Sequence, residues 1–125
     1  TGRPRRTGWF DAVIVRHSVR VNGLSSLAIN KLDTLGGIGD LKVCVAYKKP
    51  DGTVIENFPA ALEELADCTP VYETLKGFDD DVSACRSFDE LPDACRKYIE
   101  RLEELCDCHI SMVGVGPDRE QIIER

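Results

Sequence analysis

The sequence predicts a single α/β domain over residues 1–125, with helices packed on a mixed sheet that includes a β-hairpin. Residues 41–47 form a strongly apolar run that is typical of a buried strand. Residues 50–52 (Pro-Asp-Gly) follow it with a turn signal, so the chain can return as a second hairpin arm. Residues 92–106 carry apolar side chains at helical spacing, which indicates a helix with one buried face.

The first half of the chain begins with a predicted helix over residues 9–21. Its apolar positions follow helical spacing, and Asn22 and Gly23 supply a stop with glycine at the left-handed position. We expect strands over residues 24–32 and 41–47, and a return arm of the hairpin over residues 53–58. Pro59 then precedes a short predicted helix over residues 60–66.

The second half of the chain is organised around the helix at residues 92–106. Before it we expect a short extended segment at residues 71–75 and a solvated acidic loop at residues 79–82. After it we expect a strand at residues 110–113, ended by two glycines and a proline. The apolar face of the helix consists of Cys95, Tyr98, Ile99, Leu102 and Cys106.

Composition narrows the function classes. The hydrophobic content of 42% and the charged content of 30% are ordinary for a soluble globular protein, and no apolar run is long enough for a membrane span. The net charge of −6 argues against binding to a nucleic-acid duplex. The chain starts without Met, on basic residues with no apolar segment behind them, so we expect a fragment rather than a signal peptide.

The six cysteines suggest a reducing, cytoplasmic compartment. Cys44 lies in an apolar strand and Cys95 on a helix face, where cysteine acts as a small buried hydrophobe. Cys106, Cys108 and His109 lie close together, but no second ligand pair accompanies them, so we predict no metal site. We interpret His17 and His109 as structural, because neither has a base–nucleophile partner in the sequence.

Residues 30–33 (Asn-Lys-Leu-Asp) follow a predicted strand, and ligands of open α/β sheets gather at such strand ends. We name these residues the guanine segment after the base that their side chains could bind. A carboxylate such as that of Asp33 can accept hydrogen bonds from both N1–H and the exocyclic amine of guanine, a donor pair that adenine lacks. The aliphatic stem of Lys31 can lie along the purine face. Taken alone, the segment is equally well explained as an exposed polar strand end.

Residues 1–6 (Thr-Gly-Arg-Pro-Arg-Arg), the arginine segment, concentrate positive charge at the N-terminus. Arginine forks bind carboxylates and phosphates through two hydrogen bonds, and glycine keeps the backbone accessible to a ligand. On charge alone, a frayed basic terminus is the simpler explanation.

Residues 114–119 (Gly-Val-Gly-Pro-Asp-Arg), the glycine segment, follow the last predicted strand. Two glycines permit close approach of the backbone to a ligand, and Pro117 can present a rigid ring to a base. Without context, a plain turn is the better explanation of these residues.

The three segments, taken together in their order along the chain, resemble adenylosuccinate synthetase. The resemblance covers essentially the whole chain through the blocks TGRPRRTGWFD (1–11), VRVNGLSSLAINKLDTLGG (19–37), KVCVAY (42–47), PVYETLKG (70–77) and VGVGPDREQII (113–123). It implies the C-terminal part of a P-loop-like fold. It also implies a GTP- and Mg²⁺-dependent ligase that forms adenylosuccinate from IMP and L-aspartate, by phosphoryl transfer to the IMP 6-oxygen and displacement by the aspartate amine.

The resemblance also assigns roles to residues of this chain. Thr1, Gly2, Arg3, Pro4 and Arg5 would form the aspartate loop, in which Arg3 would also contact IMP and Arg5 the GTP phosphates. Guanine would be held by two segments, with Pro117 near the base: Lys31, Leu32 and Asp33 from the first, and the backbone of Gly114, Val115 and Gly116 from the second.

Two departures accompany the resemblance. Family members often carry Ser or Thr where this chain has Gly114, so a hydroxyl contact to the base is missing. The phosphate-binding loop with its catalytic Asp and His is also missing, so no catalytic or metal-binding residue is expected here, and Mg²⁺ would bind the missing N-terminal part. We therefore expect the isolated chain to be inactive and the full-length enzyme to be a cytoplasmic homodimer.

Two alternatives remain. One is a stand-alone guanine-nucleotide-binding module without catalysis, although no GxxxxGK[ST] phosphate loop is present. The other is an interaction domain whose arginines meet an acidic partner.

Overall fold

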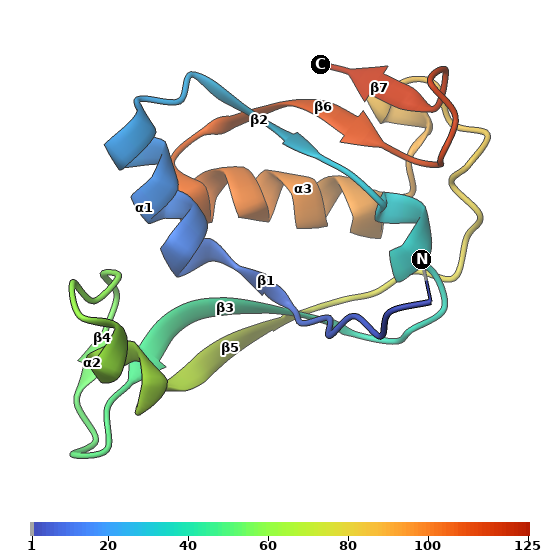
Figure 1. The fold of residues 1–125 in the computed structure, drawn as a ribbon. Helices are drawn as coiled ribbons and strands as arrows, with labels where there is room; N and C mark the ends of the chain where they lie inside the picture. The colour runs from blue at the N-terminus through green and yellow to red at the C-terminus, as the bar shows by residue number, and fades with distance from the viewer. Residues whose placement is uncertain (1) are drawn as a thin grey trace.

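Two mixed sheets and a long helix form the body of the structure, a computed structural model that describes residues 2–125. In the first sheet, β3 (Leu41–Lys48) pairs in parallel with β1 (Phe10–Asp11) and antiparallel with β4 (Val54–Ile55) and β5 (Thr69–Leu75). In the second sheet, β6 (His109–Gly114) pairs in parallel with β2 (Ser26–Ile29) and antiparallel with β7 (Ile122–Glu124). Helix α3 (Asp93–Cys106) lies between the two sheets (Figure 1). The predicted α/β class with a mixed sheet and a hairpin is confirmed.

Helix α1 spans Ala12–Asn22 and begins three residues later than the sequence predicted. Phe10 and Asp11 pair with β3 instead, and the Asp11 carboxylate caps the helix by accepting from the backbone N–H of Val13 at 2.9 Å and of Ile14 at 3.2 Å. The predicted stop is confirmed, because Gly23 adopts the left-handed conformation with φ 62°.

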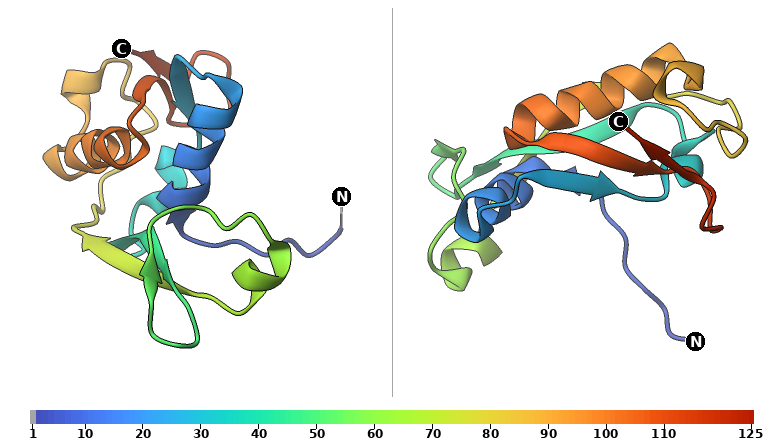
Figure 2. Two further views of the ribbon diagram at one scale, coloured as in Figure 1. Left: turned by 90° about the vertical axis from the view of Figure 1, so that its left-hand side faces the viewer. Right: turned by 90° about the horizontal axis from the view of Figure 1, so that it is seen from above.

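The predicted hairpin forms, but its return arm β4 is only two residues long. The turn closes through hydrogen bonds between Lys49 and both Thr53 and Gly52. The short helix α2 (Leu62–Ala66) follows, and β5 starts two residues before the predicted extended segment. This part of the chain projects from the body (Figures 1 and 2), and Phe58 ties it down with its ring centroid 5.2 Å from that of His17.

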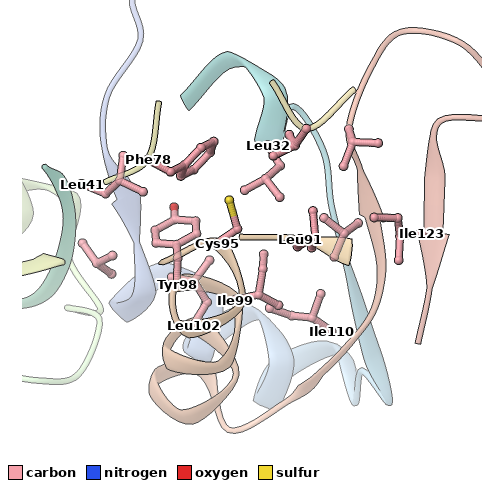
Figure 3. Close-up of a cluster of buried hydrophobic side chains, with 14 of the residues drawn as sticks. Leu32, Leu41, Phe78, Leu91, Cys95, Tyr98, Ile99, Leu102, Ile110 and Ile123 are labelled. Carbon is pink, nitrogen blue, oxygen red and sulfur yellow. The ribbon is translucent and has the colours of Figure 1, made fainter. Parts of the chain in front are cut away.

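The core lies around α3, and all five side chains of its predicted apolar face are buried. Figure 3 shows four of them, Cys95, Tyr98, Ile99 and Leu102, in one cluster with side chains from the rest of the chain: Leu32, Leu41, Phe78, Ile110 and Ile123. Cys44 and Cys95 are buried, as predicted.

Three details differ from the sequence prediction. Val82 of the acidic loop is fully buried, because the loop turns this one apolar side chain into the core. The strand β2 is shorter than predicted, and Leu32 belongs instead to the 3₁₀ turn η1 (Leu32–Leu35). The strand β7 was not predicted from the sequence.

No helix within residues 2–125 has the length and apolarity to cross a membrane.

Candidate functional site

The guanine segment and the glycine segment meet at one edge of the second sheet. Strands β2 and β6 run in parallel, with Ile29 opposite Val113. The segments that follow the two strands therefore leave the sheet at the same edge, at the carboxyl ends of the strands. A Cβ atom added to Gly114 would lie 2.8 Å from Oδ1 and 3.3 Å from Cα of Asn30. This close packing accounts for glycine at 114, where a serine or threonine side chain would need Asn30 to move.

The guanine segment turns sharply after β2. Lys31 adopts a left-handed conformation with φ 64° and is exposed, whereas Leu32 is fully buried and anchors the turn in the core. The Thr34 hydroxyl donates to the Lys31 carbonyl oxygen at 2.7 Å. Asp33 is half-buried, and its carboxylate takes part in none of the salt bridges within residues 2–125.

The glycine segment is held by Gln121, a residue that the sequence reasoning missed. Gly114 and Val115 are buried, and the Val115 N–H donates to the Gln121 carbonyl oxygen at 2.9 Å. The Asp118 N–H donates to the Gln121 side-chain oxygen at 3.0 Å, which closes the turn. A Cβ atom on Gly116, which is half-buried, would lie 2.2 Å from that same oxygen. Gly116 therefore permits close contact within the protein, and this glycine was the available sequence signal for Gln121.

Residues 2–6 of the arginine segment are exposed. Thr1 lies outside the described residues, and from Gly2, with φ 70°, the chain extends away from the body of the protein (Figure 2). The four residues that follow line an open hollow: Arg3, Pro4, Arg5 and Arg6. The structure therefore presents the three guanidinium groups of Arg3, Arg5 and Arg6 to solvent on one extended stretch of chain without regular secondary structure.

The chain that follows the arginine segment is fixed to the first sheet at Asp11. The Tyr47 hydroxyl of β3 donates to Oδ2 of Asp11 at 2.6 Å, while the other oxygen of Asp11 caps α1. Burial, and then the hydrogen bond to Asp11, raise the pKa of Tyr47 well above its ordinary value, so the phenol remains a donor. Asp11, five residues after the arginine segment, thus joins β1 to both β3 and α1.

One cavity connects the regions of the two predicted binding loops. Its volume is about 510 Å³, and it lies between residues 7–9, which follow the arginine segment, and residues 34–38, which begin in the turn that contains Asp33. Its lining residues are Thr7, Gly8, Trp9, Thr34, Leu35 and Ile38. Arg3 and Arg5 do not line this cavity, so the structure brings together the guanine and glycine segments but leaves the arginines apart from them.

The two histidines make contacts within the protein. His17 packs on Phe58, and Nδ1 of His109 lies 2.7 Å from the Glu103 carboxylate. Among the described residues 2–125, no three His, Cys, Asp or Glu side chains are placed to hold a metal ion together.

Comparison with known proteins decides the family. The sequence profile of adenylosuccinate synthetase matches residues 1–123. The chain belongs to the adenylosuccinate synthetase family. It is 51% identical over 121 residues to the adenylosuccinate synthetase of Lactococcus lactis subsp. cremoris, which covers 97% of this chain and 28% of that protein. It is 54% identical over 124 residues to the enzyme of Heliobacterium modesticaldum, which covers 99% of this chain and 29% of that protein.

The fold agrees with this family. The structure of fully ligated adenylosuccinate synthetase from Plasmodium falciparum superimposes with a TM-score of 0.93 at 36% identity, over 98% of this chain and 30% of the other. The chain therefore spans less than a third of the length of these relatives. The family suggested by residues 1–123 and the fold class are both confirmed.

Proposed function

We propose that this chain supplies the guanine pocket and the aspartate-binding arginine loop of an adenylosuccinate synthetase. The reaction joins IMP and L-aspartate to form adenylosuccinate, with conversion of GTP to GDP and phosphate, in the biosynthesis of AMP. The observation that carries the proposal is the meeting of residues 30–33 with residues 114–116 at the carboxyl edge of one sheet, beside an Asp33 carboxylate that is in no salt bridge within residues 2–125.

Each part of the guanine pocket has a distinct role in this proposal. Asp33 accepts from guanine N1–H and from the 2-amino group, which selects guanine over adenine. The exposed stem of Lys31 covers one purine face, and buried Leu32 holds both residues in place. The tight backbone from Gly114 to Gly116 forms the opposite wall of the pocket.

The arginine loop completes the contribution of this chain. Arg3 binds aspartate and IMP, and Arg5 binds aspartate and the phosphate region of GTP, because planar guanidinium forks match carboxylate and phosphate oxygens. Gly2 and Pro4, with Thr1, shape the loop. We propose that catalytic groups and Mg²⁺ belong to parts of the enzyme outside residues 1–125, and that the full-length enzyme is a cytoplasmic homodimer.

The decisive experiment replaces Asp33 by Asn in a full-length synthetase that carries this segment. The Asn amide would set a donor against the donor edge of guanine, and each unpaired buried group costs about 1–3 kcal/mol. We expect kcat/KM for GTP to fall by roughly one to four orders of magnitude. Xanthine has a carbonyl in place of the 2-amino group, so the variant should gain relative preference for XTP, while the KM values for IMP and aspartate change little.

The control for this experiment is stability. A purely structural role of Asp33 would lower the melting temperature and reduce activity with GTP and XTP equally. A well-folded Asp33→Asn variant with an unchanged GTP:XTP ratio would remove Asp33 from the guanine pocket.

Two further measurements test the rest of the proposal. Arg3→Lys and Arg5→Lys should each raise the KM for aspartate, since a charged hydrogen bond is worth about 1.5–3 kcal/mol and lysine lacks the planar fork. The isolated chain of residues 1–125 should form no adenylosuccinate from IMP, aspartate and Mg-GTP, because its groups bind and do not transfer protons. Turnover above a blank without protein would contradict that expectation.

A further inference from the structure

A single loop contacts residues that flank each half of the proposed guanine pocket. This loop, residues 77–83, follows β5 and buries Phe78 and Val82 in the core. Next to the guanine segment, the Gly37 N–H donates to the Phe78 carbonyl oxygen at 2.9 Å, and a Cβ atom on Gly36 would lie 3.3 Å from the Asp80 carbonyl oxygen. The turn that contains Asp33 therefore rests directly on this loop.

The other end of the loop is held by Gln121. The Gln121 side-chain nitrogen donates to the Ser83 carbonyl oxygen at 3.1 Å. Ser83 is itself held in place, because its N–H donates to the Asp81 carboxylate at 2.9 Å. Since the side-chain oxygen of Gln121 accepts from the Asp118 N–H, one amide connects the glycine segment to loop 77–83.

The chemistry of this link requires an amide. One atom must accept from the backbone of the glycine segment and the other must donate to the backbone of loop 77–83, and glutamine does both. Glutamate can only accept when ionised, and methionine of similar length has no donor and only a weakly accepting sulfur. The missing side chain at Gly116 leaves the room that Gln121 occupies.

We propose that Gln121 is a positioning residue for nucleotide selection, which fixes the spacing between the glycine segment and the turn of Asp33 through loop 77–83. This inference rests on the proposed guanine pocket. Gln121 needs no contact with the base, because it acts through the backbone that forms the wall of the pocket. The exposed arginine segment lies outside this linkage, so the binding of aspartate and IMP should not depend on Gln121.

The test uses Gln121→Met in a full-length synthetase that carries this segment, with Glu120→Ala as the matched control. Glu120 is the exposed neighbour of Gln121. We expect Gln121→Met to lower kcat/KM for GTP by roughly 5- to 150-fold, the equivalent of losing two neutral hydrogen bonds, with unchanged KM values for IMP and aspartate. Its preference for GTP over ITP, which lacks the 2-amino group, should also fall. Glu120→Ala should match the wild type.

A second variant, Gln121→Glu, separates the two hydrogen bonds and gives the same measurements if Gln121→Met does not fold. It keeps the acceptor for Asp118 but cannot donate to Ser83, so we expect it to lose GTP preference as well. Wild-type GTP kinetics in Gln121→Glu, or an equal loss for GTP, IMP and aspartate in either variant, would overturn the inference. Asp33→Asn is measured in parallel: if it leaves the GTP:XTP ratio unchanged, the guanine pocket itself is wrong, whereas normal Asp33 behaviour with failed Gln121 predictions rejects the positioning role alone.

Discussion

The carboxylate of Asp11 offers the sharpest test of how β1, which follows the arginine segment, is anchored. One of its oxygens caps α1 through Val13 and Ile14, and the other accepts from the Tyr47 hydroxyl at 2.6 Å. Replacing Asp11 by Ala removes the cap and the acceptor together. Replacing it by Asn keeps a good cap, because Asn is as effective as Asp at this position, and removes only the charge on the bond to Tyr47.

The expected magnitudes follow from these contacts. Loss of an N-cap costs about 0.5–2 kcal/mol, and a hydrogen bond to a charged group is worth about 1.5–3 kcal/mol. We therefore expect Asp11→Ala to lower the free energy of unfolding by about 2–5 kcal/mol. Asp11→Asn and Tyr47→Phe should each lower it by about 1–3 kcal/mol, and the double variant should lose less than their sum.

Urea unfolding of the four variants and the wild type measures these values. Ultraviolet titration of the tyrosines adds a local measurement, because burial and then the bond to Asp11 raise the pKa of Tyr47, and Asp11→Asn should bring that pKa down. Additive effects of Asp11→Asn and Tyr47→Phe, together with a Tyr47 pKa that does not respond to Asp11→Asn, would refute a stabilising role of the hydrogen bond between Tyr47 and Asp11.

Two further predictions concern stability. Gly77→Ala should destabilise the fold by about 1–3 kcal/mol or more, because the added Cβ atom would lie 1.8 Å from the Gly39 carbonyl oxygen. Gly8→Ala is the control, because a Cβ atom at Gly8 meets no atom within 4 Å. Equal melting temperatures of the two variants would contradict the reasoning. The hydrogen bond from Arg101 lowers the pKa of Glu73 in the folded state. The ionised Glu73 therefore stabilises the folded protein above the pKa of an unfolded glutamate, about 4.3, and this stabilisation is lost as the pH falls through the lower pKa of folded Glu73. Urea unfolding of wild type and Glu73→Gln should therefore differ at about pH 6, and the difference should shrink as the pH falls through the lowered pKa of Glu73; a pH-independent difference would exclude this contribution.

The sequence alone determined the elements whose pattern is local. The buried face of α3, the strand β3 and the glycine stop of α1 follow from side-chain spacing and from the conformational freedom of Gly23, and all three were predicted. The family was also predicted, because ordered blocks extend along the whole sequence. The binding roles of Asp33 and of the arginine segment remain predictions.

Only the tertiary structure decided the features that depend on contacts between distant residues. Helix α1 begins later than predicted because Phe10 and Asp11 pair with β3 as a strand. Val82 is buried in the core although the residues before it in sequence are acidic. The link from Gln121 to Ser83 joins positions 38 residues apart, and no local periodicity marks either partner. A backbone carbonyl accepts hydrogen bonds whatever its side chain, so the sequence could not identify Ser83, and only the packing of loop 77–83 between the two segments brings it to Gln121.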